Sequence, residues 1–168
     1  MNPGDVPRIE RRKVNETAFR ALREAKIPPL LARLYAARGV MGADEIAVQL
    51  AGLPRPEQLP GLDDAVDRLL MARAAGEHIC IVGDYDADGA TGTALAVRGL
   101  RALGFSRVDY RVPDRIAHGY GLTPAVVDVA CAEQAPTLLI TVDNGIASVD
   151  GVRHAKQRGV DVIVTDHH

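Results

Sequence analysis

The chain has 168 residues, 47% hydrophobic and 25% charged, which is enough for one domain with a core plus a small appendage. Its net charge of −2 excludes a general basic field that would attract nucleic acid. No apolar run approaches the roughly 20 residues that span a bilayer. The two isolated cysteines and the absence of a signal peptide favour a cytoplasmic location, and no membrane partner is expected.

The N-terminal part of the sequence predicts helices. Asn15 is suited to cap the first one, and Pro28-Pro29 ends it. The expected elements are helices over residues 16–25, 30–39, 43–50 and 62–76, with a Pro-rich linker over 53–60. We therefore expect residues 1–76 to form an N-terminal helical extension and linker.

From His78 onward the pattern alternates between short apolar runs and helical segments. The expected strands cover residues 78–83, 108–112, 137–142 and 161–165, and the expected helices cover 89–103, 123–132 and 148–158. This alternation predicts an α/β fold with a parallel sheet and flanking helices. Because the last strand has no covering helix after it, we expect residues 77–168 to form an incomplete domain.

Three of the expected strands end in carboxylate or imidazole side chains. The carboxyl ends of parallel strands meet at one edge of a sheet, so these side chains should lie close together. Clustered carboxylates repel one another unless a cation is present. Imidazole among them favours manganese or another transition metal over magnesium. The candidate metal ligands are Asp84, Asp86, Asp88, Asp143, Asp166, His167 and His168.

A glycine-rich loop follows the second expected strand, at the same edge. It could contact substrate phosphate or have only a structural role, and nearby arginines could neutralise phosphate charge. The candidate substrate-binding residues are Arg111, Arg115, His118, Gly119 and Tyr120. His78 and His154 are interpreted as structural or solvated.

Three motifs together resemble the DHH phosphoesterase superfamily. They are the segments 83–91, 142–145 and 165–168. Within that superfamily, residues 84–89 (DYDADG) and 118–122 (HGYGL) are most similar to the RecJ branch, as are residues 30–40. The resemblance covers nearly the whole chain and implies a DHH-type Rossmann-like domain.

The resemblance also implies a function. RecJ proteins are metal-dependent exonucleases that degrade single-stranded DNA from 5′ to 3′ in repair and recombination, with Mn²⁺ or Mg²⁺ and by two-metal chemistry. By resemblance, Asp86, Asp88, Asp143 and one histidine of the pair His167 and His168 are ligands and candidate catalytic residues, and Asp84 joins or supports them. Single-stranded DNA is the implied partner, with a single-strand-binding protein or a helicase as further partners.

The superfamily carries a fourth Asp motif and a second domain after the three motifs. The sequence therefore resembles the N-terminal part of such a protein, and we expect it to be inactive or weakly active alone. One alternative is another DHH branch that acts on oligonucleotides, cyclic dinucleotides or pyrophosphate. A second is a haloacid-dehalogenase-like phosphatase with Asp86 as nucleophile, which does not explain the Asp-His-His ending. A third is a non-enzymatic DNA-binding or scaffold fragment.

Overall fold

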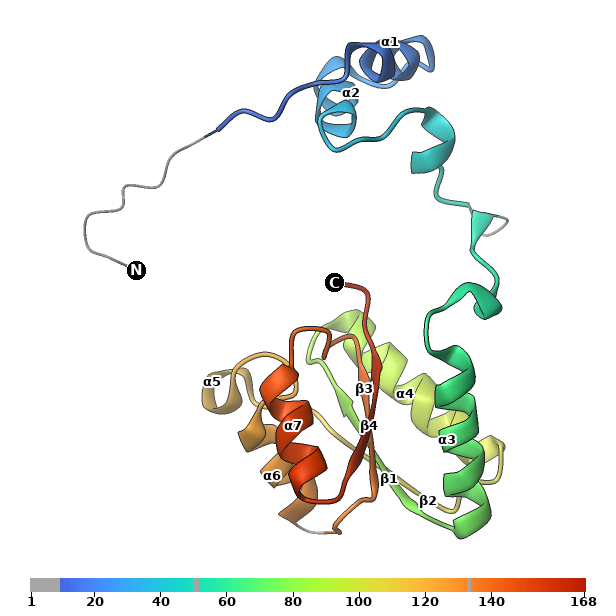
Figure 1. Cartoon of the computed structure of the whole chain (residues 1–168), viewed down its shortest axis with the longest axis vertical. Coiled ribbons are helices and arrows are strands. Elements are labelled where there is room, and N and C mark those ends of the chain that lie inside the picture. The colour runs from blue at the N-terminus through green and yellow to red at the C-terminus, as the bar shows by residue number, and fades with distance from the viewer. Residues whose placement is uncertain (1–9, 50–51, 133) are drawn as a thin grey trace, which may run out of the picture. The chain divides into compact units, whose positions relative to one another are not determined.

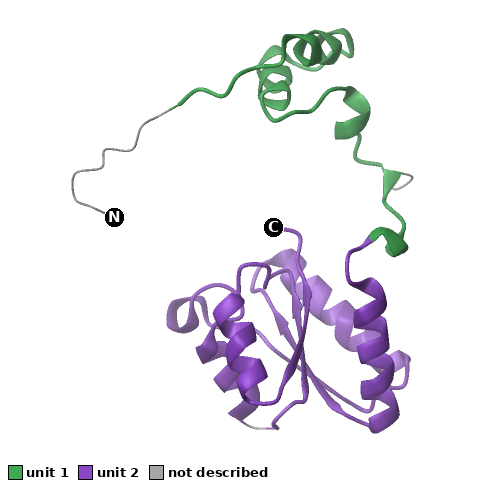
Figure 2. Cartoon of the chain, viewed as in Figure 1, with its two compact units in different colours: residues 1–58 green, residues 59–168 purple. Residues whose placement is uncertain are grey.

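The computed structural model describes residues 10–49, 52–132 and 134–168 of the chain (Figure 1). Residues 1–9, the start of the expected N-terminal extension, lie outside this part. The chain divides into two compact units, residues 1–58 and residues 59–168 (Figure 2). None of the described helices is both long enough and apolar enough to cross a membrane.

The described part of the first unit contains two α-helices, α1 (Glu16–Glu24) and α2 (Pro29–Ala36). The Asn15 side chain caps α1 by accepting hydrogen bonds from the first-turn N–H groups, as predicted. The two helices bury a small cluster made of Ala18, Leu22, Ala32 and Ala36. Small side chains dominate this cluster, so the two helices can approach closely.

The helix expected over residues 43–50 is a single 3₁₀ turn, η1 (Ala43–Ile46), and residue 50 lies outside the described part. This prediction was too long. Among the described residues 43–49, only Ile46 packs against the α1–α2 cluster, and the backbone becomes extended at Ala47. Another 3₁₀ turn, η3 (Pro56–Gln58), lies in the expected linker.

The second unit is a four-stranded, fully parallel sheet with helices on both faces (Figure 1). The strand order is β2-β1-β3-β4. The strands are β1 (His78–Gly83), β2 (Arg107–Arg111), β3 (Leu138–Val142) and β4 (Asp161–Thr165). The predicted α/β class, with its parallel sheet and flanking helices, is confirmed.

Two separate apolar clusters hold the layers together. On one face, α3 (Leu62–Ala75) and α4 (Ala87–Ala102) contribute Ala72, Val97 and Leu100 to a core with Ile79 and Ile81 of β1. On the other face, α6 (Pro124–Ala132) and α7 (Val149–Gln157) pack on alternate residues of the same strand. Because β1 is covered on both faces, all six of its residues are buried.

Helix α3 belongs with the sheet. Ala72 is fully buried in the core of the second unit, and Leu69 packs against that core. The division of the chain into compact units, between residues 58 and 59, falls within the expected 53–60 linker. The domain boundary predicted from the sequence lies between residues 76 and 77. Helical spacing alone does not show which core a helix joins.

The strand order positions the candidate site. The chain runs from β1 outward to β2 and then returns across β1 to β3, so the direction of the strand order reverses between β1 and β3. Gly83, Val142 and Thr165 are register partners at the ends of β1, β3 and β4. The residues that follow them, Asp84, Asp143 and Asp166, therefore start from one row at the carboxyl edge, where open parallel sheets bind ligands.

Candidate metal centre

The turn after β1 brings two carboxylates to this edge. Asp84 is buried, with 6% of its surface exposed. Asp86 caps α4, because its Oδ1 accepts a hydrogen bond of 3.0 Å from the N–H of Gly89. This hydrogen bond lowers the pKa of Asp86 below its usual value. A Cβ at Gly89 would lie 2.6 Å from the carbonyl oxygen of Asp84, so glycine permits the tight turn.

Asp143 lies at the centre of the edge and is held by its backbone. Its N–H donates to the carbonyl of Thr165 at 3.0 Å, and its carbonyl accepts from the Tyr120 hydroxyl at 3.1 Å. Its φ is +63°, in the left-handed region that a non-glycine residue rarely adopts. Backbone strain of this kind occurs preferentially at functional sites. The side chain is buried, with 6% exposed.

Asp166 organises the segment after β4. Its Oδ2 accepts from the N–H of Ile146 at 2.8 Å, and its Oδ1 accepts from the N–H of His167 at 2.7 Å. Oδ1 also lies 2.6 Å from Nδ1 of His168. Burial raises the pKa of Asp166, but the hydrogen bonds from Ile146, His168 and His167 outweigh it and bring the pKa to about 2. The hydrogen bond to Asp166 in turn raises the pKa of His168.

His167 connects this segment to the other two. Its Nε2 lies 2.7 Å from Oδ1 of Asp143 and 3.7 Å from Oδ2 of Asp88. The rings of His167 and His168 stack, with centroids 4.6 Å apart. Imidazole Nε2 is a common metal-binding atom, so His167 can serve as a ligand from the third strand end.

Within the described part of the chain, two groups of ligand atoms could hold a cation, and Asp143 belongs to both. One is Asp84, Asp86 and Asp143, and the other is Asp143, His167 and His168; within each group the ligand atoms lie within 4.8 Å of one another. Oδ1 of Asp143 is buried and accepts no hydrogen bond within the described residues, although His167 is close. A buried carboxylate oxygen without a hydrogen bond is costly unless a cation neutralises it.

The structure leaves two candidate ligands outside these groups. The Asp88 side chain is 67% exposed, and its Oδ2 lies 3.7 Å from Nε2 of His167. Both oxygens of Asp166 already accept hydrogen bonds, and its side chain is 2% exposed. Asp86, Asp84, Asp143, His167 and His168 therefore form the compact part of the predicted ligand set.

Among the predicted substrate-binding residues, Tyr120 joins the site directly. Besides its contact to Asp143, its hydroxyl lies 3.2 Å from Nδ1 of His168. Burial, and after it the negative charge of Asp166, raises the pKa of Tyr120. The tyrosine therefore stays protonated and can donate a hydrogen bond at neutral pH.

The other predicted substrate-binding residues lie around the loop. The guanidinium of Arg115 lies 4.2 Å from the centroid of the Tyr85 ring. Residues Arg115–His118 form a short helix, α5, where the sequence suggested only a loop, because Asp114 caps its N–H groups. Gly119 follows with φ +74°. Nη1 of Arg111 lies 3.6 Å from Oδ2 of Asp109, which belongs to the same strand, β2.

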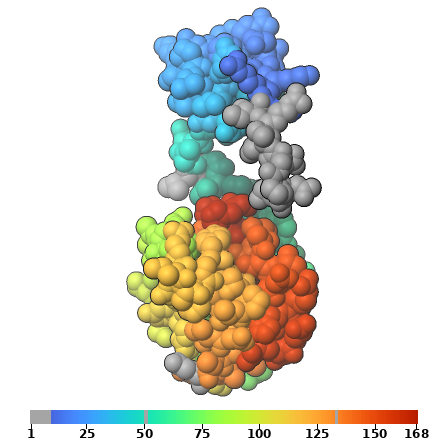
Figure 3. All heavy atoms as spheres, turned by 90° about the vertical axis from the view of Figure 1, so that its left-hand side faces the viewer, coloured from blue at the N-terminus to red at the C-terminus, as the bar shows by residue number. Residues whose placement is uncertain are grey.

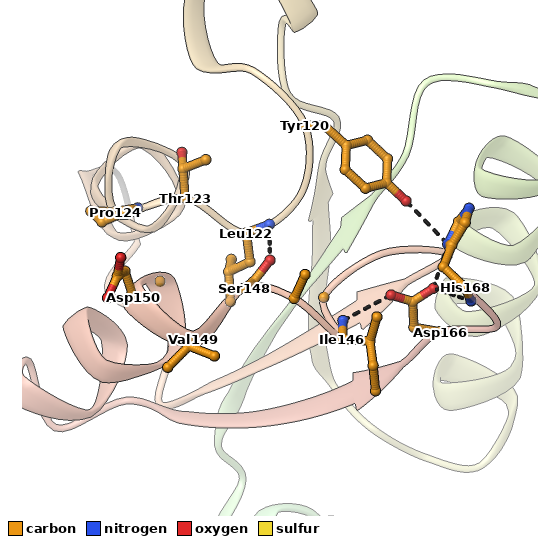
Figure 4. A pocket seen from close by; sticks show the side chains of 13 residues that line it. Tyr120, Leu122, Thr123, Pro124, Ile146, Ser148, Val149, Asp150, Asp166 and His168 are labelled. Atoms are coloured by element: carbon orange, nitrogen blue, oxygen red, sulfur yellow. Dashed lines mark hydrogen bonds and ion pairs between the residues drawn. The ribbon is translucent and has the colours of Figure 1, made fainter. Parts of the chain in front are cut away.

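A cavity of about 400 Å³ opens beside the ligands (Figure 4). Tyr120, Asp166 and His168 form one wall, and the start of α7 and Leu122 form another. A second cavity of about 310 Å³ is lined by Asp88, Asp143 and His167, among others. The gold segment with α5 and the red C-terminal residues lie side by side at this surface, as the Tyr120–His168 contact also shows (Figure 3).

Sequence reasoning missed the role of Asn144. Its side chain is 1% exposed, and its Nδ2 donates to the carbonyl oxygens of Val82 at 3.1 Å and Val142 at 2.9 Å. The signals in the sequence were its place in the Asp143-Asn144-Gly145 turn, which is common in proteins, and in the 142–145 motif; neither indicates a hydrogen bond to β1. His78, interpreted as structural or solvated, is buried at 3% exposed.

The fold and the site define an α/β protein with a carboxylate and imidazole centre at the switch point of its sheet. Residues 78–168 match the DHH family, N-terminal domain, and the chain belongs to this family.

The chain is similar to curated proteins named single-stranded-DNA-specific exonuclease RecJ. It is 52% identical over 160 residues to the protein of Escherichia coli K12, covering 95% of this chain and 27% of that protein. It is 40% identical over 146 residues to the protein of Bacillus subtilis 168, covering 84% of this chain and 18% of that one. The chain thus spans about a quarter of the length of the E. coli relative.

Solved structures show the same likeness. A crystal structure of exonuclease RecJ bound to manganese matches with TM-score 0.60 and 45% identity, covering 71% of this chain and 29% of that one. The structure of RecJ in complex with Mn²⁺ from Thermus thermophilus matches with TM-score 0.56 and 36% identity, covering 92% of this chain and 21% of that one. The expected similarity to the RecJ branch is confirmed.

Proposed function

We propose that the edge formed by β1, β3 and β4 binds divalent cations, Mn²⁺ or Mg²⁺, in a phosphodiesterase that degrades single-stranded DNA. The observation that carries this proposal is that Asp143 belongs to two groups of candidate ligands, one with Asp84 and Asp86 and the other with His167 and His168. Within each group the ligand atoms lie within 4.8 Å of one another. Two groups that share one carboxylate suit a pair of ions. Two of the RecJ structures that match the chain are bound to manganese.

The donor set fits this cofactor. Carboxylate oxygens suit Mg²⁺ and Mn²⁺, and the imidazole nitrogens shift the preference toward Mn²⁺. If His168 donates its Nδ1–H to Asp166, the neutral ring keeps the lone pair on Nε2. We propose Asp88 as a further metal ligand, because its exposed carboxylate lies next to His167.

The proposed reaction is hydrolysis of a phosphodiester. Bound metal ions would activate a water and stabilise the charge that develops on the phosphate oxygens. The chain's own residues hold the ligands in place and bind the strand. Tyr120 presents a donor hydroxyl beside the ligands, and Arg115 offers a guanidinium for phosphate. His118, Gly119 and Arg111 are the remaining proposed substrate contacts.

The proposed substrate is single-stranded DNA, attacked from its 5′ end in DNA repair and recombination in the cytoplasm. A single-strand-binding protein or a helicase is the proposed protein partner. Support for these assignments comes from the similarity to proteins named single-stranded-DNA-specific exonuclease, of which this chain spans about a quarter. We propose that the 168 residues alone hydrolyse DNA weakly.

The test compares two polypeptides with Mn²⁺ present. One is the 168-residue chain, and the other continues through the region that follows in the E. coli relative. Both are assayed on 5′-labelled and 3′-labelled single strands, on duplex DNA and on pyrophosphate. Faster release of the 5′ label from single strands by the longer polypeptide supports the proposal. Equal rates on duplex DNA, or hydrolysis of pyrophosphate alone, would indicate another DHH branch.

A further inference from the structure

We infer that Asn144 is a positioning residue, which sets the distance between the carboxylates after β1 and the carboxylate after β3. This inference rests on the proposed metal site. Asn144 does not itself belong to either group of ligand atoms. It acts through the backbone of the two strands on which the groups depend.

The Asn144 side chain links two strand ends that are far apart in sequence. Its amide nitrogen donates to the carbonyl of Val82, 62 positions earlier, and to that of Val142. Val82 lies two residues before Asp84, and Val142 directly precedes Asp143. One NH₂ group therefore links β1 and β3 near the end of each strand, just before the candidate metal ligands Asp84 and Asp143.

The orientation of the amide is fixed by its partners. Two carbonyl oxygens can accept hydrogen bonds only from the NH₂ end, so the side chain cannot be flipped. The Oδ1 end is consequently buried, and it accepts no hydrogen bond within the described part of the chain. An unsatisfied buried acceptor destabilises the fold, so stability alone does not account for asparagine at this position.

The geometry of Asp143 shows what the link achieves. Its N–H is bound to β4 through Thr165, its carbonyl is bound to Tyr120, and Asn144 ties the adjoining backbone to β1. These contacts keep Asp143 in its left-handed conformation, with φ +63°, so that one carboxylate reaches both groups of ligand atoms. Without the amide, nothing else described in the turn connects it to β1 by a side-chain hydrogen bond.

The test uses Asn144→Leu, which keeps the volume of the side chain and removes its donors. Mn²⁺ binding is measured from the electron paramagnetic resonance signal of free Mn²⁺ during a titration of the 168-residue chain. We expect about a 10- to 100-fold loss of Mn²⁺ affinity, the size typical of a group that supports a metal ligand. Circular dichroism establishes that the variant is folded under the assay conditions.

A matched control separates positioning from general loss of stability. Val108→Ala removes buried apolar surface from β2, which carries none of the grouped ligands. It should unfold at lower denaturant than the parent chain but bind Mn²⁺ with unchanged affinity. Unchanged affinity in folded Asn144→Leu, or an equal loss in Val108→Ala, would overturn the inference.

A double variant tests the coupling itself. If Asn144 acts by placing the carboxylates, Asp86→Asn should reduce affinity less in the Asn144→Leu background than in the parent chain. Additive losses would show that Asn144 acts elsewhere and would contradict the inference. Absence of Mn²⁺ binding by the parent chain would instead contradict the proposed metal site, and with it this inference.

Discussion

Nε2 of His167 lies 2.7 Å from Oδ1 of Asp143, which joins the ends of β4 and β3 across the candidate metal centre. The two atoms are close but are not aligned as a hydrogen bond. Both are atoms that bind divalent metals, and both come from segments held by backbone hydrogen bonds. The ligands are therefore assembled by the fold itself, and a cation has only to enter between them.

Asp143→Asn tests the shared carboxylate. The substitution keeps the shape of the side chain but removes a charge from both groups of ligand atoms. We expect Mn²⁺ affinity to fall by more than the roughly 100-fold that marks the loss of a supporting contact. Isothermal titration calorimetry gives the affinity. Asp67→Asn, on the exposed surface of α3, is the control, and a comparable loss in that variant would show that the effect is general electrostatics.

Gly145→Ala should destabilise the second unit. Gly145 has φ +119°, and a Cβ there would lie 2.6 Å from Oγ1 of Thr141. We expect a loss of about 1 to 3 kcal/mol in the free energy of unfolding, measured with urea.

Gly99→Ala is the matched control for this variant. Gly99 lies within α4, and a Cβ there would meet nothing within 4 Å. This second alanine should stabilise the chain by about 0.5 to 1 kcal/mol, through the helix propensity of alanine. Equal effects of the two substitutions would show that the turn after β3 is not constrained as described.

The stability of the second unit should depend on Glu77. Its Oε2 accepts hydrogen bonds from Arg68 at 2.7 Å and from Thr137 at 2.6 Å, and these lower the pKa of Glu77. A carboxylate whose pKa is lower in the folded state stabilises the fold above its unfolded pKa of about 4.3, and loses that contribution as pH falls through the folded value. Glu77→Gln should therefore cost about 1 to 2 kcal/mol at pH 7.

The same comparison at low pH tests whether the charge of Glu77 stabilises the fold. The difference in unfolding free energy between the parent chain and Glu77→Gln should shrink as pH falls below about 4, because the parent carboxylate is then protonated. Urea denaturation across the pH range measures it. A difference that grows toward acid would mean that the charge of Glu77 does not stabilise the fold.

Much of the second unit could be predicted from the sequence because its signals are local. The run Ile79-Cys80-Ile81-Val82 ends in Gly83 and Asp84, and both the strand and the carboxylate position follow from that pattern. The alternation of strands with helices then places other strand ends at the same edge. Asp143 and the Asp166 segment were found in this way.

The features that the sequence did not reveal depend on contacts between distant residues. The hydrogen bond from Asn144 to Val82 spans 62 positions, and no local pattern marks it. The hydrogen bond from the N–H of Ile146 to Asp166 also joins residues that are distant in sequence, and it uses a carboxylate that was expected to bind metal. The extra length predicted for the 43–50 helix arose because apolar spacing does not show whether a core is available.

We propose above that cations bind between Asp84, Asp86, Asp143 and the two histidines, His167 and His168. Anomalous diffraction at the manganese absorption edge, from a crystal soaked in a manganese salt, tests it most directly. We predict anomalous density within coordination distance of Asp143, with Asp86 and His167 among the ligands, and none bound to Asp166. Anomalous density that is absent from this edge of the sheet, or that lies against the Asp166 carboxylate without contact to Asp143, would contradict it.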